Sequence, residues 1–289
     1  FLLAVGIAIP FSVASFRKTG QPGWRFTLRV LRRAAVLVAI GCLLVSLDRG
    51  YPLVSLGVLQ LIGIDYFLGA LLYRIPWQGR VALSALLLIA YWAALKFIPV
   101  PGLGVGVLEE GRNLIEYWNH TSLAAFRVGG LPVIAPTTAL VLIGTLLGDL
   151  FRAKIDRRRT VGWLLAGGAA TTGLSLIWSL HLAFNKPLWT SPFILFSAGA
   201  GAVLLGLLYI TLDIKGWRAW AFPFAVFGAN ALLAYILPTG IKYTVVRALS
   251  VTFNGGITLT RGWVGTSIYL VLWWVVCWVL YRKKWFIRV

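Results

Sequence analysis

The residues best suited to polar chemistry lie in a short segment, 185–193, between two long apolar segments. It contains Asn185, Lys186 and Trp189; a Trp ring is favoured at a membrane interface, whereas packing does not require an Asn-Lys pair. Ser191 is expected to accept a backbone N–H as a helix N-cap, with the following proline at the first helical position. A helix should therefore begin at about Ser191, and the polar residues before it are left for function.

Two histidines are candidates for proton transfer. His120 lies in the long connection 99–130, and His181 lies at the end of an apolar segment. A neutral imidazole can act as a general base for an amine or hydroxyl nucleophile. The alternatives are structural, because a histidine is also favoured at a helix C-terminus and in a solvated loop. Both histidines are therefore weaker catalytic candidates.

Polar side chains inside apolar segments are costly in a membrane and therefore point to a site or to a buried interaction. Such residues are Gln60, Asp65, Asp149 and Asn230. Asp65 falls near the middle of its segment and needs a partner or water. Asp149 lies near a segment end and is expected to reach towards Arg152 and Lys154. Asn230 falls in the middle of its segment, where it can bind a ligand or hydrogen-bond a neighbouring helix.

These residues are positioned by a chain in which 60% of residues are hydrophobic and 12% are charged, with a mean hydropathy of +0.86. About 20 apolar residues suffice for a helix to cross ~30 Å of hydrocarbon. We expect an all-α polytopic membrane protein with about nine visible transmembrane helices, a single domain over residues 1–289, and one or more helices upstream of Phe1. The apolar segments are 1–16, 28–47, 53–73, 81–98, 131–151, 162–182, 191–212, 220–239 and 265–281.

The formal net charge of +19 comes from short basic clusters between apolar segments. In such positions Lys and Arg set topology and contact anionic lipid, so nucleic acid is not an expected partner. The connections expected in the cytoplasm carry Arg17 to Arg33, Arg74 and Arg80, Arg152 to Arg159, Lys215 and Arg218, and the tail Arg282 to Arg288. The C-terminus is then cytoplasmic, and segment 185–193 and connection 99–130 face the exoplasmic side.

Connection 99–130 is longer than an ordinary turn, and long loops commonly carry function. Helical periodicity from Leu108 to Trp118 predicts an interfacial helix, with Arg112 and Glu116 as an i,i+4 ion pair. No metal site is expected, because the chain has only two histidines, and its two cysteines lie in apolar segments. There is also no P-loop and no nucleophile elbow.

Four stretches carry a family resemblance: VGIAIPFS at 5–12, GVLQLIG at 57–63, NKPLWTSPFIL at 185–195 and WAFPFAVFGANAL at 220–232. With these stretches in this order and at this spacing, the sequence resembles the bacterial relatives within the heparan-α-glucosaminide N-acetyltransferase family of transmembrane acyltransferases. The resemblance implies acetyl transfer from cytosolic acetyl-CoA to the amine of an amino sugar on the exoplasmic side. It also implies a catalytic histidine upstream of Phe1. Leu61 stands where the family usually has Arg.

The resemblance further implies which residues form the site. The substrate pocket would be lined by Gln60, Asn185, Lys186, Trp189 and Asn230. Candidates for binding the CoA phosphates are Arg29, Arg32 and Arg33, for which a topology role is the alternative.

Two other hypotheses remain open. One is a non-catalytic subunit that keeps the family fold within a larger membrane complex, which Leu61 and the 14 Trp residues allow. The other is a transporter for a small sugar, since a cavity with polar residues within the membrane also suits transport. The expected location is a bacterial inner membrane, with lipid and an amino sugar as partners and a homo-oligomer as one possible assembly.

Overall fold

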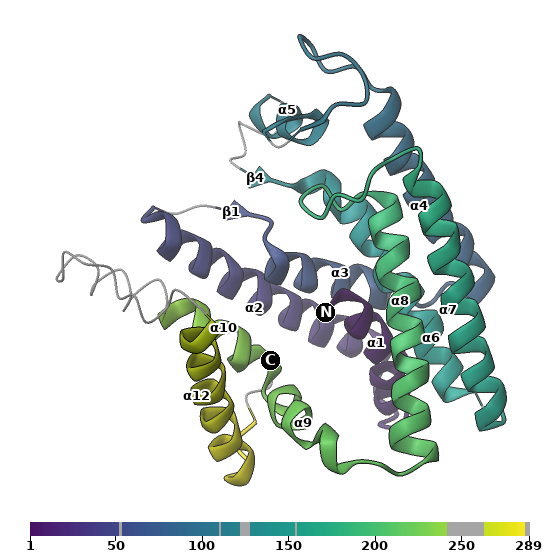
Figure 1. Cartoon of the computed structure of the whole chain (residues 1–289), viewed down its shortest axis with the longest axis vertical. Coiled ribbons are helices and arrows are strands. Elements are labelled where there is room, and N and C mark those ends of the chain that lie inside the picture. Colours follow the sequence, from purple (N-terminus) through teal and green to yellow (C-terminus); the bar gives the residue numbers. More distant parts are fainter. Residues whose placement is uncertain (52–53, 110, 122–127, 154, 242–262, 287–289) are drawn as a thin grey trace. The chain divides into compact units, whose positions relative to one another are not determined.

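The structure is a computed structural model that describes residues 1–51, 54–109, 111–121, 128–153, 155–241 and 263–286. Helices make up nearly all of its regular structure, and the strands within these residues are two residues long and lie in connections (Figure 1). The chain is therefore an all-α membrane protein, as the hydropathy of the sequence predicted.

Among the residues that the structure describes, five helices are long and apolar enough to cross a membrane. They are α2 (Gly23–Arg49), α4 (Trp77–Phe97), α6 (Ile134–Arg152), α7 (Arg157–Ser179) and α8 (Ser191–Tyr209). Shorter apolar helical segments lie in α1 (Leu2–Arg17), α3 (Val58–Leu72), α9 (Phe222–Ala229) and α12 (Trp263–Arg282). Each of the nine apolar segments of the sequence thus contains helix, but a count of nine membrane spans stays a prediction.

The chain comprises two compact units. Unit 1 consists of residues 1–42 and 53–214, and unit 2 consists of residues 43–52 and 215–289. Unit 1 contains α1, α3, α4, α6, α7, α8 and most of α2, whereas α9, α10 (Ala231–Ile241) and α12 belong to unit 2. Whether the whole chain is a single domain stays a prediction.

Helix α6 is the centre of unit 1, where α1, α3, α4 and α8 pack against it. Its apolar window is 61% buried, the largest share among the five candidate spans. Helix α1 approaches it closely because Gly6 and Gly144 face each other; a Cβ built on Gly6 would lie 2.2 Å from the carbonyl oxygen of Val141. Small residues allow helix backbones to meet in this way in membranes.

The helices of unit 1 end at two opposite levels. Tyr73, directly after α3, donates to Asp149 near the end of α6 at 2.6 Å, and the ring of Phe151 lies 5.7 Å from that of Tyr209 at the end of α8. We call the level at which α3, α6 and α8 end the basic end, because it carries Arg74 and the cluster that begins α7. We call the opposite level, where α8 begins, the loop end. Helices α3, α6 and α8 each run from the loop end to the basic end. This common direction agrees with the alternation of helix directions that the basic clusters predicted.

A buried ion pair joins α4 to α6 near the basic end. Arg80 has a side chain only 5% exposed, and it donates to the Asp149 carboxylate and to Thr145 Oγ1. The prediction that Arg80 belongs to a connection between helices is therefore wrong, since it lies within α4. Asp149 contacts Arg152 only at 4.0 Å, and Lys154 lies outside the described residues, so Arg80 is its main partner.

Helices α7 and α8 also pack through glycines. A Cβ on Gly168 would lie 2.8 Å from the carbonyl oxygen of Gly199, so the two backbones are in direct contact. The neighbouring Gly167 is exposed, and a Cβ there would meet no atom within 4 Å. Two adjacent glycines in one helix therefore have opposite tolerance for a side chain.

This difference gives a stability prediction. Gly168→Leu should push α7 and α8 apart and destabilise the protein by about 1–3 kcal/mol, the usual cost of overpacking. Gly167→Leu is the matched control, because its side chain would point into open space. Thermal unfolding in detergent should show a lower midpoint for Gly168→Leu alone, and equal midpoints for both variants would contradict this packing.

Candidate functional site

Connections of unit 1 meet at the loop end and form the frame of the candidate site. β1 (Val54–Ser55), which precedes α3, pairs in parallel with β4 (Val128–Gly129), which precedes α6 (Figure 1). The backbone N–H of Gly130 donates to Asn119 Oδ1 at 2.9 Å, so the end of connection 99–130 is tied to its own short helix. Backbone and amide hydrogen bonds therefore hold this frame together.

Connection 99–130 folds as a hairpin followed by a short helix. Its elements are β2 (Leu108–Glu109), β3 (Arg112–Asn113) and α5 (Leu114–His120). Gly111, at φ 75°, supplies the positive φ that a tight turn needs, and Asn113 Oδ1 accepts the Glu116 N–H at 3.0 Å as the N-cap of α5. The predicted helix from Leu108 to Trp118 is thus wrong over its first half.

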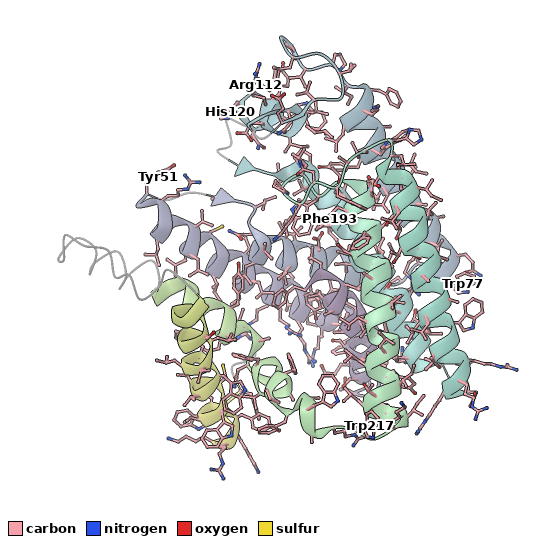
Figure 2. The ribbon with its side chains drawn as sticks, viewed as in Figure 1. Tyr51, Trp77, Arg112, His120, Phe193 and Trp217 are labelled. Atoms are coloured by element: carbon pink, nitrogen blue, oxygen red, sulfur yellow. The ribbon has the colours of Figure 1, made fainter. Side chains whose placement is uncertain are left out.

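The hairpin also changes the predicted ion pairing. Arg112 lies in β3 opposite Glu109, and their charged atoms are 3.9 Å apart on an exposed surface. Glu116 instead contacts His120, with 2.8 Å between Glu116 Oε1 and His120 Nε2. The expected Arg112–Glu116 pair is therefore wrong. Figure 2 shows Arg112 and His120 beside the short helix at the loop end.

Segment 185–190 is a turn organised by Asn185. Its Oδ1 accepts the Leu188 N–H at 2.9 Å, and its backbone carbonyl accepts the Thr190 N–H at 3.2 Å. The fully buried Thr190 hydroxyl accepts the Asn185 N–H and donates to the carbonyl of Ala183. The polarity that marked this segment in the sequence is thus partly used to fix its own shape.

Two buried hydrogen bonds attach this turn to α4. Tyr91 donates to the Leu188 carbonyl at 2.7 Å, and Ser191 donates to the Leu88 carbonyl at 2.7 Å. The helix does begin at Ser191 as expected, but Thr190 occupies the N-cap position. The prediction that Ser191 caps the helix is wrong, because its hydroxyl is engaged across the helix interface as a donor.

An apolar cluster lies beneath the turn and the hairpin. Its buried members are Tyr91, Leu95, Val100, Leu114, Ile115, Leu182 and Leu188. They come from α4, connection 99–130 and the chain on both sides of Asn185. This cluster makes the loop end a packed platform on which polar side chains can be held in place.

A cavity of about 340 Å³ opens on this platform. Its lining combines the turn, the hairpin, α5 and the chain around β1 and β4. The side chains that give it polar character are Asn113, Glu116, Asn119, Asn185 and Trp189. Glu116 is the only ionisable residue among the described residues that line it.

Trp189 lines the cavity in a strained conformation. Its φ is 50°, in the left-handed region that a bulky residue rarely adopts and that costs of the order of 1–2 kcal/mol. Its ring makes an edge-on contact with Phe193, with ring centroids 6.1 Å apart. Such strain is concentrated at binding and active sites, where the surrounding structure enforces it. Trp189 is therefore the aromatic surface that the fold presents to this cavity.

Gln60 and Asp65, both on α3, are almost completely buried. Gln60 lies in the first turn of α3, close to the backbone of Gly41, and its Nε2 has no hydrogen-bond partner among the described residues. Asp65 Oδ1 accepts a hydrogen bond from Thr138 Oγ1 at 2.8 Å, so the partner expected for this carboxyl group is a hydroxyl group. Leu61, between them, is 1% exposed and part of the apolar interior.

The other candidate residues lie apart from the cavity lining. Lys186 and His181 are both exposed, and His181 follows the C-terminal end of α7. Asn230 belongs to unit 2, where its Nδ2 donates to the Trp285 carbonyl at 3.1 Å. It lies at a break between α9 and α10, so the single helix expected over 220–239 is interrupted there.

The three arginines proposed for CoA are exposed on α2. The Arg29 guanidinium lies 5.0 Å from the ring centroid of Phe16, and that of Arg33 lies 5.2 Å from the ring centroid of Tyr66. Arg32 is exposed as well. Their role in cofactor binding stays a prediction.

Asn113, Glu116 and Asn119 line the cavity but were not predicted as site residues. The sequence contains a local signal for the first two. Asn113 and Glu116 are spaced as an N-cap and the third helical residue, which is the pattern of a capping box. This spacing marks the start of α5 and brings Glu116 and Asn119 to successive turns of one short helix. The contact of Asn119 with Gly130 is tertiary and leaves no comparable local signal.

Fold and cavity define a polytopic helical membrane protein with a polar, aromatic-lined site beside one set of helix ends. The family model described as heparan-alpha-glucosaminide N-acetyltransferase, catalytic, matches residues 1–184. The chain belongs to this family, and the resemblance seen in the sequence is confirmed.

Two curated relatives carry the name heparan-alpha-glucosaminide N-acetyltransferase. The Homo sapiens protein is 24% identical over an alignment that covers 100% of this chain and 53% of the relative. The Mus musculus protein is 23% identical, with 100% of this chain and 54% of the relative covered. The chain thus spans about half the length of the curated relatives it matches.

The Asn185 turn gives a prediction about local stability. Asn185→Ala removes the acceptor for the Leu188 N–H, and loss of one hydrogen bond costs about 1 kcal/mol. Amide hydrogen exchange at Leu188 should become about fivefold faster. Lys186→Ala, at an exposed position in the same turn, should leave the rate unchanged. Equal rates in Asn185→Ala and the unmodified protein would contradict the assigned role of Asn185.

Proposed function

We propose that this protein is a transmembrane acetyltransferase that moves the acetyl group of acetyl-CoA to the amine of a glucosamine-type sugar. The family match over residues 1–184 supports the reaction class. The observation that supports a role for particular residues is the loop-end cavity, which is lined by Asn185, Trp189, Glu116 and Asn119. Residues far apart in the sequence thus form one polar site.

The size and lining of the cavity suit one sugar ring. Its volume of about 340 Å³ lies at the lower end of the 300–1,000 Å³ typical of small-molecule pockets. The Trp189 ring offers an aromatic face, and the Asn side chains offer amide groups whose carbonyl oxygens have a second lone pair. A sugar has both an apolar ring face and hydroxyl groups, so this lining is complementary to it.

Glu116 gives the site a preference for an amino sugar. Its carboxylate contacts His120 through Oε1 and accepts from Asn119 at 3.4 Å through Oε2, which leaves acceptor sites on both oxygens. An amino sugar carries a positive charge when protonated, and a hydrogen bond between charged groups is worth about 1.5–3 kcal/mol. We assign Glu116 to recognition of the substrate amine.

The reaction requires the amine to lose a proton and attack the acetyl carbonyl. The C–N bond then forms, the bond from the acetyl carbon to its leaving group breaks, and the carbonyl oxygen carries negative charge in the transition state. Asn185 or Lys186 would donate to that oxygen. The base or acyl carrier would be the family histidine expected upstream of Phe1, with His120 and His181 as weaker candidates.

The roles of the remaining candidate residues are those that the family resemblance implies. Gln60 would contact the ligand from the first turn of α3, four residues after Leu56, which lines the cavity. Asn230 stays a substrate-binding candidate on the basis of the family resemblance alone. The exposed guanidinium groups of Arg29, Arg32 and Arg33 would bind CoA phosphates, since exposed arginines bind phosphate oxygens with paired N–H groups. The basic end would face the cytoplasm of a bacterial inner membrane, with the C-terminus on the same side.

Acetyl transfer can be measured directly. Membranes that contain the protein should convert radiolabelled acetyl-CoA and glucosamine to labelled N-acetylglucosamine, above the level of membranes without it. Absence of transfer to every amino sugar tested would overturn the proposal. Uptake of sugar into proteoliposomes without an acyl donor would instead support a transporter.

The role of Glu116 has a sharper test. Glu116→Gln keeps the size and shape of the side chain, but it removes the negative charge and replaces one acceptor oxygen by an NH₂ donor. The KM for glucosamine should therefore rise about tenfold, equivalent to about 1.4 kcal/mol. The KM for acetyl-CoA should stay the same. Glu109→Gln is the control, because Glu109 lies in the same connection, 99–130, but outside the cavity lining. Equal KM values for both variants would contradict the assignment.

A further inference from the structure

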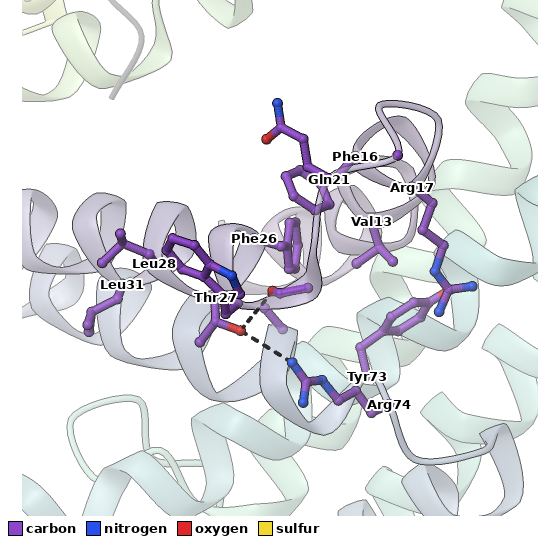
Figure 3. A pocket seen from close by; sticks show the side chains of 14 residues that line it. Val13, Phe16, Arg17, Gln21, Phe26, Thr27, Leu28, Leu31, Tyr73 and Arg74 are labelled. Atoms are coloured by element: carbon purple, nitrogen blue, oxygen red, sulfur yellow. Dashed lines mark hydrogen bonds between the residues drawn. The ribbon is translucent and has the colours of Figure 1, made fainter.

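A second cavity lies in unit 1, between the ends of α1 and α3 and the start of α2 (Figure 3). Its volume is about 1140 Å³, and it shares no lining residue with the loop-end cavity. Apolar side chains form most of its wall: Val13, Phe16, Phe26, Leu28, Leu31 and Ala70. We call this cavity the basal groove.

Two arginines line the polar side of the basal groove. Arg17 is the last residue of α1, and Arg74 follows α3; both are exposed and both line the groove. Arg74 donates to Thr27 Oγ1 at 3.2 Å, which fixes its position beside the first turns of α2 (Figure 3). The described residues that line the groove include no acidic side chain to neutralise these cations.

The groove runs from polar to apolar along α2. Trp24 and Leu31 are seven residues apart, which corresponds to about 10 Å along a helix. Trp24 is 62% exposed, as expected for a Trp ring at the headgroup level, whereas Leu28 and Leu31 present exposed apolar side chains deeper along the same helix. The groove therefore extends for about 10 Å, which is long enough to hold a phospholipid headgroup and the upper part of an acyl chain.

We propose that the basal groove binds an anionic phospholipid. Its phosphate lies between Arg17 and Arg74, and one acyl chain lies along Leu28 and Leu31. The positive charge of the two arginines favours an anionic headgroup, since each Lys or Arg near an anionic membrane surface contributes about 1 kcal/mol to binding. A free phosphate compound would leave the long apolar wall uncovered, so the two parts of the groove together require a lipid. This site is independent of the acetyl-transfer proposal.

Native mass spectrometry of the purified protein tests this site. The probes are dioleoyl phosphatidylglycerol and dioleoyl phosphatidylcholine, which share acyl chains and differ in headgroup charge. The protein should retain phosphatidylglycerol about tenfold more strongly. Arg17→Gln/Arg74→Gln should abolish this preference, and Arg17→Lys/Arg74→Lys should keep most of it, which shows that charge rather than misfolding is responsible.

A matched control uses two exposed arginines outside the groove. Arg158→Gln/Arg159→Gln removes the same charge from the start of α7 and should keep the lipid preference. Glycerol phosphate, which has the anion without acyl chains, should not displace phosphatidylglycerol.

Three results would overturn the proposal: equal retention of both lipids, equal loss of preference in the control variant, or displacement of the lipid by glycerol phosphate or by CoA. The last result would assign the groove to a soluble phosphate ligand.

Discussion

The rest of unit 1 depends on one constraint: in an apolar helical bundle, each polar group needs a partner within the protein. Arg80 and Asp149 pair with each other and connect α4 to α6, the helix on which four others pack. Removing one member of such a pair leaves an uncompensated charge, so both must be kept together. The positions of α3, α4 and α6, and therefore of the loop end above them, follow from interactions of this kind.

The same constraint explains how the loop end becomes a site. Tyr91 and Ser191 use buried hydroxyl groups to attach the Asn185 turn to α4, and Asn113, Asn119 and Asn185 hold loop backbone. Most of the polar groups therefore build the platform. The carboxylate of Glu116 and the ring of the strained Trp189 line the cavity, and we propose them as the groups that contact a ligand. A rigid platform is what a binding site for a small polar molecule needs.

Hydropathy was sufficient to predict the membrane class and the helical segments, because burial in lipid demands long apolar helices. The start of α8 at Ser191 was predicted from the Ser191-Pro192 pair, because proline is favoured in the first helical turn. Arg80 could not be identified as buried, since a cation beside an apolar segment has the same local pattern whether it marks topology or meets Asp149 in space. The break at Asn230 was missed for a similar reason, because hydropathy averages over it.

Local chemistry explains the errors at the loop end. Periodicity alone favoured a helix from Leu108, although Gly111 and the Asn113–Glu116 spacing indicate a turn followed by a helix start. Once the hairpin forms, Arg112 faces Glu109, and Glu116 is released to contact His120. The cavity itself depends on contacts between distant connections, which no single segment of the sequence encodes.

The central claim is that an amino sugar binds in the loop-end cavity. Photolysis of a diazirine-bearing glucosamine on the protein in native membranes, followed by peptide mass spectrometry, tests it most directly. The account predicts labelled residues within 108–119 and 185–189, with labelling suppressed by unmodified glucosamine. Labelling confined to residues 215–286, or labelling that unmodified glucosamine does not suppress, would contradict it.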